Sequence, residues 1–229
     1  MPLADLGPGV MAGFTDASLD LAATGGMTAL AAQLGHQVVL AQQVHGTTLT
    51  WVDQPPTGFV ADAGPCDAMA TRLTGVVLAV RTADCVPVLL ADPAARLVAA
   101  IHAGWRGVFS QIVPRAVRQL NQMGAANLRA AIGPAICARC YAVSQDLAER
   151  FAEAGLPVSR TRDGEPSLNL VAGVTNQLQD NGVDCIAAVG HCTKCHPGYF
   201  SYRKQGQKAG RQCGWIWQEA LWQGAKEPS

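Results

Sequence analysis

Two histidines and one cysteine stand where predicted strands meet loops. His45 and His102 each follow or end an apolar run, and Cys85 stands just before another run at residues 86–90. Loops at strand ends, held by a rigid sheet, are common places for functional sites. Two imidazoles and one thiolate suit Zn²⁺ and leave a fourth position for water or substrate, and the same set suits copper when a weak axial Met completes it.

Spacing alone leaves other interpretations of these residues open. Cys85 could act as a nucleophile with His102 as its base, which would need a thiolate and an oxyanion hole. It could also be an inert buried thiol beside hydrogen-bonded histidines. Asp84 precedes Cys85 and would point to the opposite face of a strand. It orients a histidine if the backbone turns there, and otherwise it caps a turn.

Two C-x-x-C pairs form a second candidate group of metal ligands. The pairs are Cys137/Cys140 and Cys192/Cys195. Far more residues separate them than the roughly 15–20 of a compact zinc ribbon. Loop thiols without a ligand are therefore favoured, and a structural site across the chain, with His191 and His196 nearby, stays open. A thioredoxin-like redox motif is disfavoured because no βαβ unit leads into Cys137.

Arginines and aromatic residues gather in the glycine-rich loops. Arg106, Arg203 and Arg211 could present guanidinium forks to a phosphate, although solvated surface positions are the plainer interpretation. Tyr202 and the aromatic residues around it could stack on a base or fill the core, and core filling is favoured.

The composition narrows the class of protein. The 229 residues include 17 Lys+Arg and 17 Asp+Glu, so the formal charge is zero and nucleic acid is not expected as a partner. A hydrophobic fraction of 49% excludes a disordered chain. No apolar run reaches the roughly 20 residues that span a bilayer, and the N-terminus lacks the basic region of a signal peptide. We expect a cytoplasmic protein without membrane contact, in which the eight cysteines are thiols or metal ligands.

Strands that alternate with helices predict an α/β fold. The expected helices cover residues 27–34, 109–123, 144–154 and 170–180. The expected strands cover residues 37–43, 75–80, 86–90, 96–102, 128–132 and 185–189, with β structure also in residues 199–217. Prolines and glycines predict a loop at residues 53–64, and Pro87 predicts an edge position or a bulge. No repeat or linker divides the chain, so we expect one compact domain over residues 1–229.

Six short motifs occur in an order that resembles one known family. They are Gln43-Val44-His45-Gly46, Asp67-Ala68-Met69 with Thr71, Thr82-Ala83-Asp84-Cys85-Val86-Pro87, His102-Ala103-Gly104-Trp105-Arg106-Gly107, Ile132-Gly133-Pro134-Ala135-Ile136, and Cys192-Thr193 followed by Phe200-Ser201-Tyr202-Arg203 and Gly210-Arg211. Together they resemble the YfiH family, also called the multicopper polyphenol oxidase or laccase-domain family, over about residues 41–217.

The resemblance implies a fold, a metal and an activity. The fold is a single α/β domain with mixed β-sheets flanked by helices, and the metal is zinc, with copper as the alternative, held by His45, Cys85 and His102. The implied activity is purine nucleoside phosphorylase, acting on adenosine, inosine and S-methyl-5'-thioadenosine with phosphate. Adenosine deaminase activity is implied in the same site.

The resemblance also directs the choice of further site residues. The candidates for catalysis are Asp84, which would orient a metal ligand, and Arg106, and those for substrate binding are Arg203, Arg211 and Tyr202. A monomer or a small homo-oligomer is expected.

Two functions of other kinds stay open. One is a copper-dependent polyphenol oxidase. Such an enzyme needs several coppers, and laccases carry many more histidines to bind them than the five of this chain. The other alternative function is that of a peptidoglycan-editing factor or a metal-stabilised regulator. The family usually opens with a Thr-Arg-x-Gly-Gly stretch, and this chain has Gly13-Phe14-Thr15-Asp16-Ala17 in its place, without the arginine.

Overall fold

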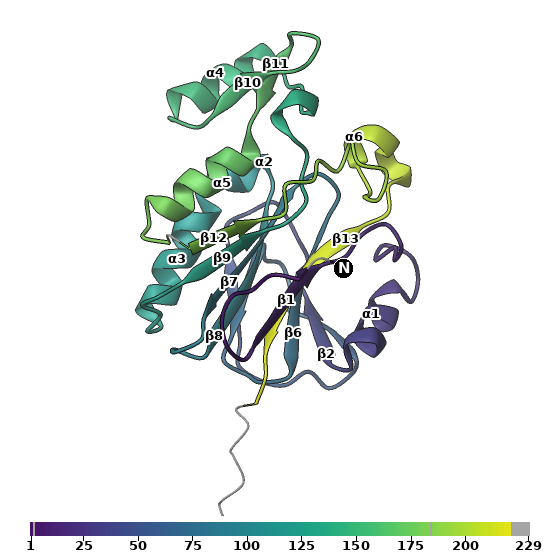
Figure 1. Ribbon diagram of the computed structural model, residues 1–229, viewed down its shortest axis with the longest axis vertical. Helices are drawn as coiled ribbons and strands as arrows, with labels where there is room; N and C mark the ends of the chain where they lie inside the picture. Colours follow the sequence, from purple (N-terminus) through teal and green to yellow (C-terminus); the bar gives the residue numbers. More distant parts are fainter. Residues whose placement is uncertain (2, 184, 221–229) are drawn as a thin grey trace, which may run out of the picture.

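Two β-sheets stack face to face in the computed structural model, which describes residues 1, 3–183 and 185–220 (Figure 1). One sheet has the order β1 (Val10–Phe14), β13 (Gln212–Gln218), β6 (Val76–Thr82), β2 (Gln37–Leu40) and β4 (Val60–Asp62). The other has the order β12 (Cys185–Ala188), β9 (Arg129–Ile132), β7 (Val86–Asp92), β8 (Leu97–Ala103), β5 (Ala68–Thr71) and β3 (Leu49–Val52). A two-stranded ribbon joins β10 (Val158–Arg160) to β11 (Pro166–Leu168).

The described part of the chain has six helices. They are α1 (Gly26–Leu34), α2 (Trp105–Phe109), α3 (Ile112–Gln122), α4 (Gln145–Glu153), α5 (Leu170–Gln179) and α6 (Tyr202–Gln205), with 3₁₀ turns at Ala138–Cys140 and Gly206–Lys208. Figure 1 shows α3 and α5 on one side of the paired sheets and α1 on the other. Helix α4 packs with the β10–β11 ribbon.

Three apolar clusters hold these layers together. Phe14 and Leu78 from the five-stranded sheet meet Leu89 and Val98 from the six-stranded sheet between the two. Other clusters join the six-stranded sheet to α3 and α5, and the five-stranded sheet to α1. The expected single α/β domain with mixed sheets is confirmed.

The strand order brings four chain segments together at one side of the six-stranded sheet, where the ends of four strands meet. Strand β7 pairs antiparallel with β8, so Val86 at the start of β7 lies opposite Ala103 at the end of β8. Strand β5 also pairs antiparallel with β8 and starts beside Ile101, and β3 starts beside β5. The residues that precede β3, β5 and β7 therefore meet the end of β8.

Strand β7 lies in the interior of the sheet, so the expected edge position of Pro87 is wrong. Pro87 is the second residue of β7, and the ladder with β9 begins one residue later, at Val88. The Pro87 carbonyl accepts the Gly133 N–H beyond the end of β9. The N–H that proline lacks would point to the same side, where no further β9 residue needs it. At the other end of β7, Asp92 accepts the N–H groups of Ala126 and Asn127, each at 2.8 Å.

Several other boundaries differ from expectation. The helix expected at residues 109–123 begins only at Ile112, as α3, because Gln111 adopts a left-handed conformation (φ 62°) before it, and Phe109 is the last residue of the separate helix α2. The loop expected at residues 53–64 contains the short strand β4. The tail at residues 199–217 begins with helical turns, and only β13 is a strand there.

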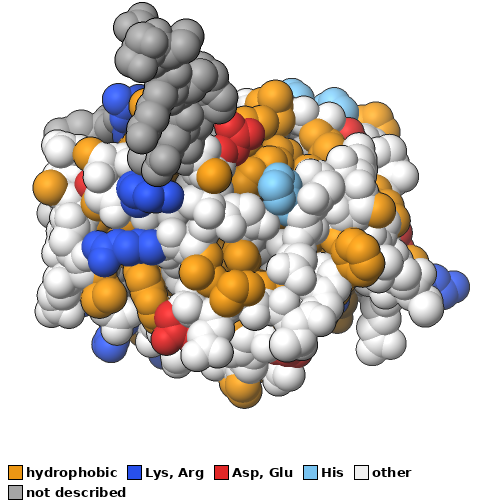
Figure 2. Space-filling model, turned by 90° about the horizontal axis from the view of Figure 1, so that it is seen from below, with side chains coloured by type: hydrophobic (Ala, Val, Ile, Leu, Met, Phe, Trp, Pro, Cys, Tyr) orange, Lys and Arg blue, Asp and Glu red, His pale blue; other side chains and the backbone are white. Residues whose placement is uncertain are grey.

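The surface of the described residues carries charges of both signs. Figure 2 shows one face on which Lys, Arg, Asp and Glu side chains are scattered among apolar ones. None of the helices in the described part of the chain has the length and apolar character that crossing a membrane takes.

We predict that Gly133→Ala lowers the free energy of unfolding by about 1–3 kcal/mol, the usual cost of overpacking a core. A Cβ atom at Gly133 would overlap the Phe14 ring and lie 2.7 Å from Pro87 Cγ, and neither ring can move aside easily. Urea unfolding measures the loss as a lower midpoint at constant slope. Gly190→Ala is the control, since a Cβ there meets nothing within 4 Å, and equal stability of the two variants would contradict the prediction.

Candidate metal centre

His45, Cys85 and His102 come together at the shared edge of the six-stranded sheet. Each offers a ligand atom, and these atoms all lie within 4.8 Å of one another. Cys85 Sγ is 4.0 Å from His45 Nε2, and the two imidazoles meet edge to face with their centroids 4.8 Å apart. His102 is buried and His45 is exposed, so the cluster has one buried and one open side.

Asp67 fixes the two histidines relative to each other. Its buried carboxylate accepts the backbone N–H groups of Val44, His45 and Gly46 at 2.6–3.2 Å. It also lies 2.8 Å from His102 Nδ1. A carboxylate only accepts hydrogen bonds, so Nδ1 carries the proton and Nε2 is left for the cluster. Three N–H groups around one carboxylate hold His45 in a left-handed conformation (φ 60°).

Gly104 leaves the space that the cluster occupies. A Cβ atom at this position would lie 2.9 Å from His45 Cδ2 and 3.1 Å from Cys85 Sγ. Both distances are too short for ordinary contacts, so any larger residue would push the imidazole or the sulfur out of place. This close approach explains a glycine directly after β8, between Ala103 and Trp105.

The electrostatics of the cluster favour a thiolate beside an imidazolium when no metal neutralises them. Burial acts to raise the pKa of the Cys85 thiol, but attraction to His102 and hydrogen bonds from both imidazoles lower it to about 6. Burial acts to lower the pKa of His102, but the Cys85 thiolate and the Asp67 carboxylate raise it to about 9. Burial also acts to raise the pKa of Asp67, and hydrogen bonds from His102 and Gly46 outweigh it and lower the pKa.

Asp84 does not contact either histidine through any hydrogen bond of the described residues. Its carboxylate accepts from Thr193 Oγ1 at 2.7 Å and from the Arg203 N–H at 2.6 Å, and its carbonyl accepts the Ile136 N–H at 3.0 Å. Its backbone is left-handed (φ 97°), which turns the chain sharply just before Cys85. Asp84 thus fixes the corner that presents the thiol, and Asp67 performs the orientation of histidine that the sequence suggested for Asp84.

The other candidate residues lie in different settings. The exposed Arg203 places its guanidinium 4.9 Å from the Tyr141 ring and donates to the Ala142 carbonyl. Burial, and then the nearby Cys85 thiolate, raises the pKa of Tyr141 to about 12, so its hydroxyl stays protonated. The charge of the Cys85 thiolate thus reaches Tyr141, and the Arg203 guanidinium lies against the same ring.

Among the described residues, no hydrogen bond connects the His45–Cys85–His102 cluster to the side chains of Arg106, Arg211 or Tyr202. Arg106 is exposed and its guanidinium lies 4.5 Å from the Trp105 ring. Arg211 Nη1 donates to two backbone carbonyls of its own loop. Tyr202 is half exposed, at 50%, so the expectation that it fills the core is not met.

The two C-x-x-C pairs also come together. The ligand atoms of Cys137, Cys140, Cys192 and Cys195 all lie within 4.8 Å of one another. Such proximity was not expected from their separation along the chain. His191 and His196 are not part of this group among the described residues.

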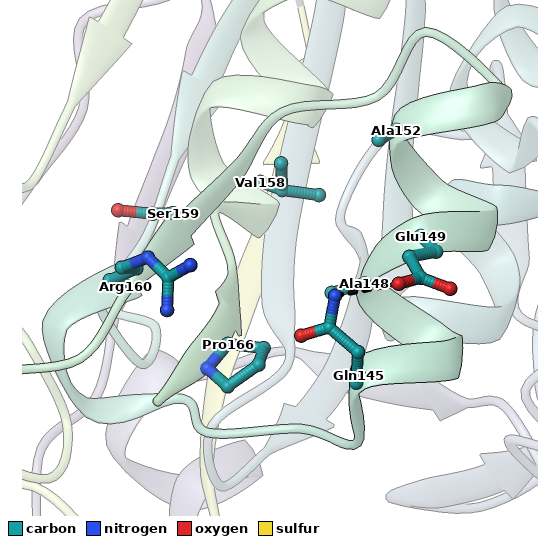
Figure 3. Close-up of a pocket in the computed structure, with 8 residues that line it drawn as sticks. All are labelled: Gln145, Ala148, Glu149, Ala152, Val158, Ser159, Arg160 and Pro166. Atoms are coloured by element: carbon teal, nitrogen blue, oxygen red, sulfur yellow. Dashed lines mark hydrogen bonds between the residues drawn. The ribbon is translucent and has the colours of Figure 1, made fainter. Parts of the chain in front are cut away.

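A cavity of about 380 Å³ lies between α4 and the β10–β11 ribbon, and Figure 3 shows its lining. Gln145, Glu149, Ser159 and Arg160 are its polar lining residues, and Gln145 Nε2 donates to Glu149 Oε1 at 2.7 Å. None of the residues of either cysteine-containing cluster lines it. A hollow with polar groups in its lining is a usual candidate for a site, but here the metal-binding donor groups lie elsewhere.

The donor set fits a single transition-metal ion. Zn²⁺ binds imidazole nitrogen at about 2.0–2.1 Å and thiolate sulfur at about 2.3 Å, and three protein ligands leave one position for water or substrate. The Asp67–His102 contact is the carboxylate–histidine arrangement that orients metal ligands. Sequence reasoning missed Asp67, although it stands in one of the quoted motifs, and it missed Tyr141, for which no motif gave a signal.

The fold and this site define the class: an α/β protein with two stacked sheets and a His–Cys–His cluster at the strand ends of one of them. The chain belongs to the family described as multi-copper polyphenol oxidoreductase laccase, whose family model matches residues 14–219. The resemblance drawn from the motifs is confirmed.

Similar proteins support the same assignment. The chain is 42% identical over 188 residues to a purine nucleoside phosphorylase of Streptomyces coelicolor, covering 79% of this chain and 75% of that protein. It is 34% identical over 200 residues to an adenosine deaminase, RL5, of an unknown prokaryotic organism, covering 80% and 76%. The crystal structure of Bacillus licheniformis YfiH superimposes with a TM-score of 0.83 at 25% identity, covering 92% and 93%. The chain is an enzyme.

We predict that Cys85 in metal-free protein reacts with an alkylating reagent at half its maximal rate at about pH 6 and near its full rate at neutral pH. Only the thiolate reacts, and the pKa of about 6 keeps Cys85 ionised well below the ordinary value of 9.0. Mass spectrometry of the Cys85 peptide after timed alkylation measures the profile. His102→Ala removes the attracting imidazolium and should move the midpoint upward, and a wild-type midpoint near pH 9 would contradict the prediction.

We predict that Asp67→Asn weakens zinc binding at this cluster by about 10–100-fold, as is typical when the partner of a ligating histidine is lost. The amide cannot hold the N–H groups of residues 44–46 and the His102 ring as the carboxylate does. Competition with a chromophoric chelator measures the affinity. The control is Asp53→Asn, a substitution at an exposed carboxylate. Equal affinities in the two variants would show that Asp67 does not orient the ligands.

Proposed function

We propose that this enzyme is a zinc-dependent purine nucleoside phosphorylase that also deaminates adenosine. The observation that carries the proposal is the His45–Cys85–His102 cluster, ordered by Asp67 on its buried side and exposed at His45. Relatives named purine nucleoside phosphorylase and adenosine deaminase support it. The proposed substrates are adenosine, inosine and S-methyl-5'-thioadenosine with phosphate.

Zinc, when bound, would supply Lewis-acid polarisation and an activated water or an oriented phosphate at its open position. The residues of this chain prepare that position. Asp67 keeps the proton on His102 Nδ1, so that Nε2 binds as a neutral imidazole. The low pKa of Cys85 supplies a thiolate at neutral pH without a separate base.

Phosphorolysis requires residues that bind the attacking phosphate. In phosphorolysis a phosphate oxygen bonds to C1′ of the ribose, the bond from C1′ to the purine nitrogen breaks, and the base leaves with a proton. Arg203 is exposed beside Tyr141 and uses one of its donors on the Ala142 carbonyl. Its remaining N–H groups are the proposed phosphate contacts. Arg106 is proposed to assist catalysis, and Arg211 and Tyr202 are proposed to bind substrate.

Asp84 acts in this proposal by positioning Cys85. The thiol follows a left-handed residue whose carboxylate is held by Thr193 and by the N–H of Arg203. The same carboxylate thus joins the thiol to the start of the segment that carries Arg203 and Tyr202.

In deamination, water replaces the amino group at the purine C6, and ammonia leaves.

A copper-dependent polyphenol oxidase is the second candidate, and the description of the family favours it. Reduction of O₂ to water takes four electrons, for which oxidases of that kind use several coppers. Among the described residues, one candidate metal group contains histidine, and the other is made of cysteines. Copper in excess of two ions per chain in untreated protein would favour oxidation.

A metal-stabilised regulator or peptidoglycan-editing factor is the third candidate, and a Cys85→Ala protein that loses metal but keeps partner binding would favour it. A cytoplasmic location and a monomer or small homo-oligomer without nucleic-acid or membrane partners stay predictions of the sequence.

We predict that purified protein with adenosine and phosphate yields adenine, ribose 1-phosphate and inosine, and that His102→Ala lowers the turnover by about 10²-fold or more. The loss is expected because the variant lacks the metal ligand that Asp67 orients. Chromatography of the products, with metal content measured on the same sample, tests this. His36→Ala, which changes a histidine whose ring lies tilted against Trp217 and outside the cluster, should keep full turnover. Wild-type protein with zinc present and no turnover would contradict the proposal.

A further inference from the structure

Two cysteine-bearing loops lie side by side at the ends of two parallel strands. Strand β9 pairs parallel with β12, and residues 133–140 and 189–198 continue from them at the same edge. The loops stay paired beyond the strands, because Ala135 N–H donates to the His191 carbonyl and Thr193 N–H donates to the Ala135 carbonyl. This pairing places one C-x-x-C segment opposite the other.

The four sulfur atoms face one another at distances that suit a metal ion. All lie within 4.8 Å of one another, and Cys140 Sγ lies 3.2 Å from Cys195 Sγ. A tetrahedron with bonds of about 2.3 Å to zinc separates its sulfur atoms by about 3.8 Å. A disulfide would need about 2.05 Å, and all four cysteines are thiols here.

Donor groups around the sulfur atoms are arranged to stabilise thiolates. The Cys137 N–H donates to Cys192 Sγ at 3.3 Å, and Arg162 Nη2 donates to Cys195 Sγ at 3.7 Å. Four thiolates this close repel one another strongly unless a cation lies between them. A doubly charged cation would remove that repulsion.

The neighbouring histidines are engaged elsewhere. The rings of His191 and His196 stack with their centroids 4.8 Å apart. His191 Nδ1 lies 3.1 Å from the Tyr199 hydroxyl, and His196 Nδ1 accepts the Gly198 N–H at 3.0 Å. The donor set is therefore four sulfur atoms. Soft tetrahedral S₄ sites select zinc or iron, and a complete set of four protein ligands is typical of a structural ion.

We propose that Cys137, Cys140, Cys192 and Cys195 bind one structural zinc ion, separate from the ion at His45, Cys85 and His102. The ion joins two segments that are far apart in the sequence. It closes the sheet edge where β9 and β12 end, and it leaves no position for a substrate.

The proposed ion also supports the corner that presents Cys85. Ile136, next to Cys137, donates its N–H to the Asp84 carbonyl, and Thr193, next to Cys192, donates its hydroxyl to the Asp84 carboxylate. Both loops thus hold the residue before Cys85, and Thr193 is fully buried at that contact. Loosening the loops would release Asp84 from both sides.

Metal analysis of protein purified without chelators tests the proposal. We expect about two zinc ions per chain in the wild type, about one in the Cys140→Ser/Cys195→Ser variant, and about one in His102→Ala. Cys66→Ala, at a buried thiol outside both groups, is the control and should keep two. A double serine variant with as much zinc as the wild type would overturn the proposal, and iron in this site would overturn the choice of zinc.

Thiol mapping of the wild type tests the proposal even if the double variant fails to fold. The peptides that carry the four cysteines should resist alkylation in zinc-loaded protein and react after chelation. Ready alkylation of all four in loaded protein, or a disulfide between Cys140 and Cys195, would overturn the site. The contacts to Asp84 further imply that the double variant holds its remaining zinc about 10-fold more weakly. Unchanged affinity would overturn the supporting role.

Discussion

The contact of the Asp67 carboxylate with the residue 44–46 turn and with His102 is the interaction on which the site depends. It joins a loop that follows β2 to the end of β8, and it is buried from water. A buried carboxylate is costly unless hydrogen bonds satisfy it. Here three backbone N–H groups and one imidazole do so, which couples the folding of the loop to the position of the ring. The two histidines therefore acquire their geometry from one shared partner.

The structure around this carboxylate leaves little freedom to the third ligand. Gly104 lies against both His45 and Cys85, so the chain after β8 sets the distance between the imidazole and the sulfur. Asp84 turns the chain on the other side of Cys85. The site is thus assembled from four strand ends, and the hollow between α4 and the β10–β11 ribbon contributes none of its ligands. The metal-binding donor atoms, and not this hollow, locate the centre.

The sequence predicted the parts of this arrangement that local patterns encode. Continuous apolar runs identified β7 and β8, and their ends pointed to Cys85 and His102, because buried strands are read directly from such runs. The strands β3 and β4 have only four and three residues, which is too short to show a period, so they were missed. Asp67 was missed as a partner because nothing in a sequence tells which carboxylate a histidine will meet.

The contact between the two C-x-x-C pairs also could not be predicted from local sequence patterns, because the pairs are far apart along the chain. Helices α4 and α5 and the β10–β11 ribbon separate them along the chain, and the parallel pairing of β9 with β12 brings them together. That pairing is a property of the sheet order, which local composition does not encode. The position of Pro87 is a related case, since its tolerance depends on where β9 ends.

Strand β7 has a carboxylate holding neighbouring loops at each end, Asp84 before its first residue and Asp92 at its last. A slip of this strand by one residue would break both sets of contacts and turn every side chain to the opposite face of the sheet. The contacts of Asp84 and Asp92 therefore fix the register of β7 from both of its ends. The direction in which the Cys85 sulfur points is thereby a property of the whole sheet's register.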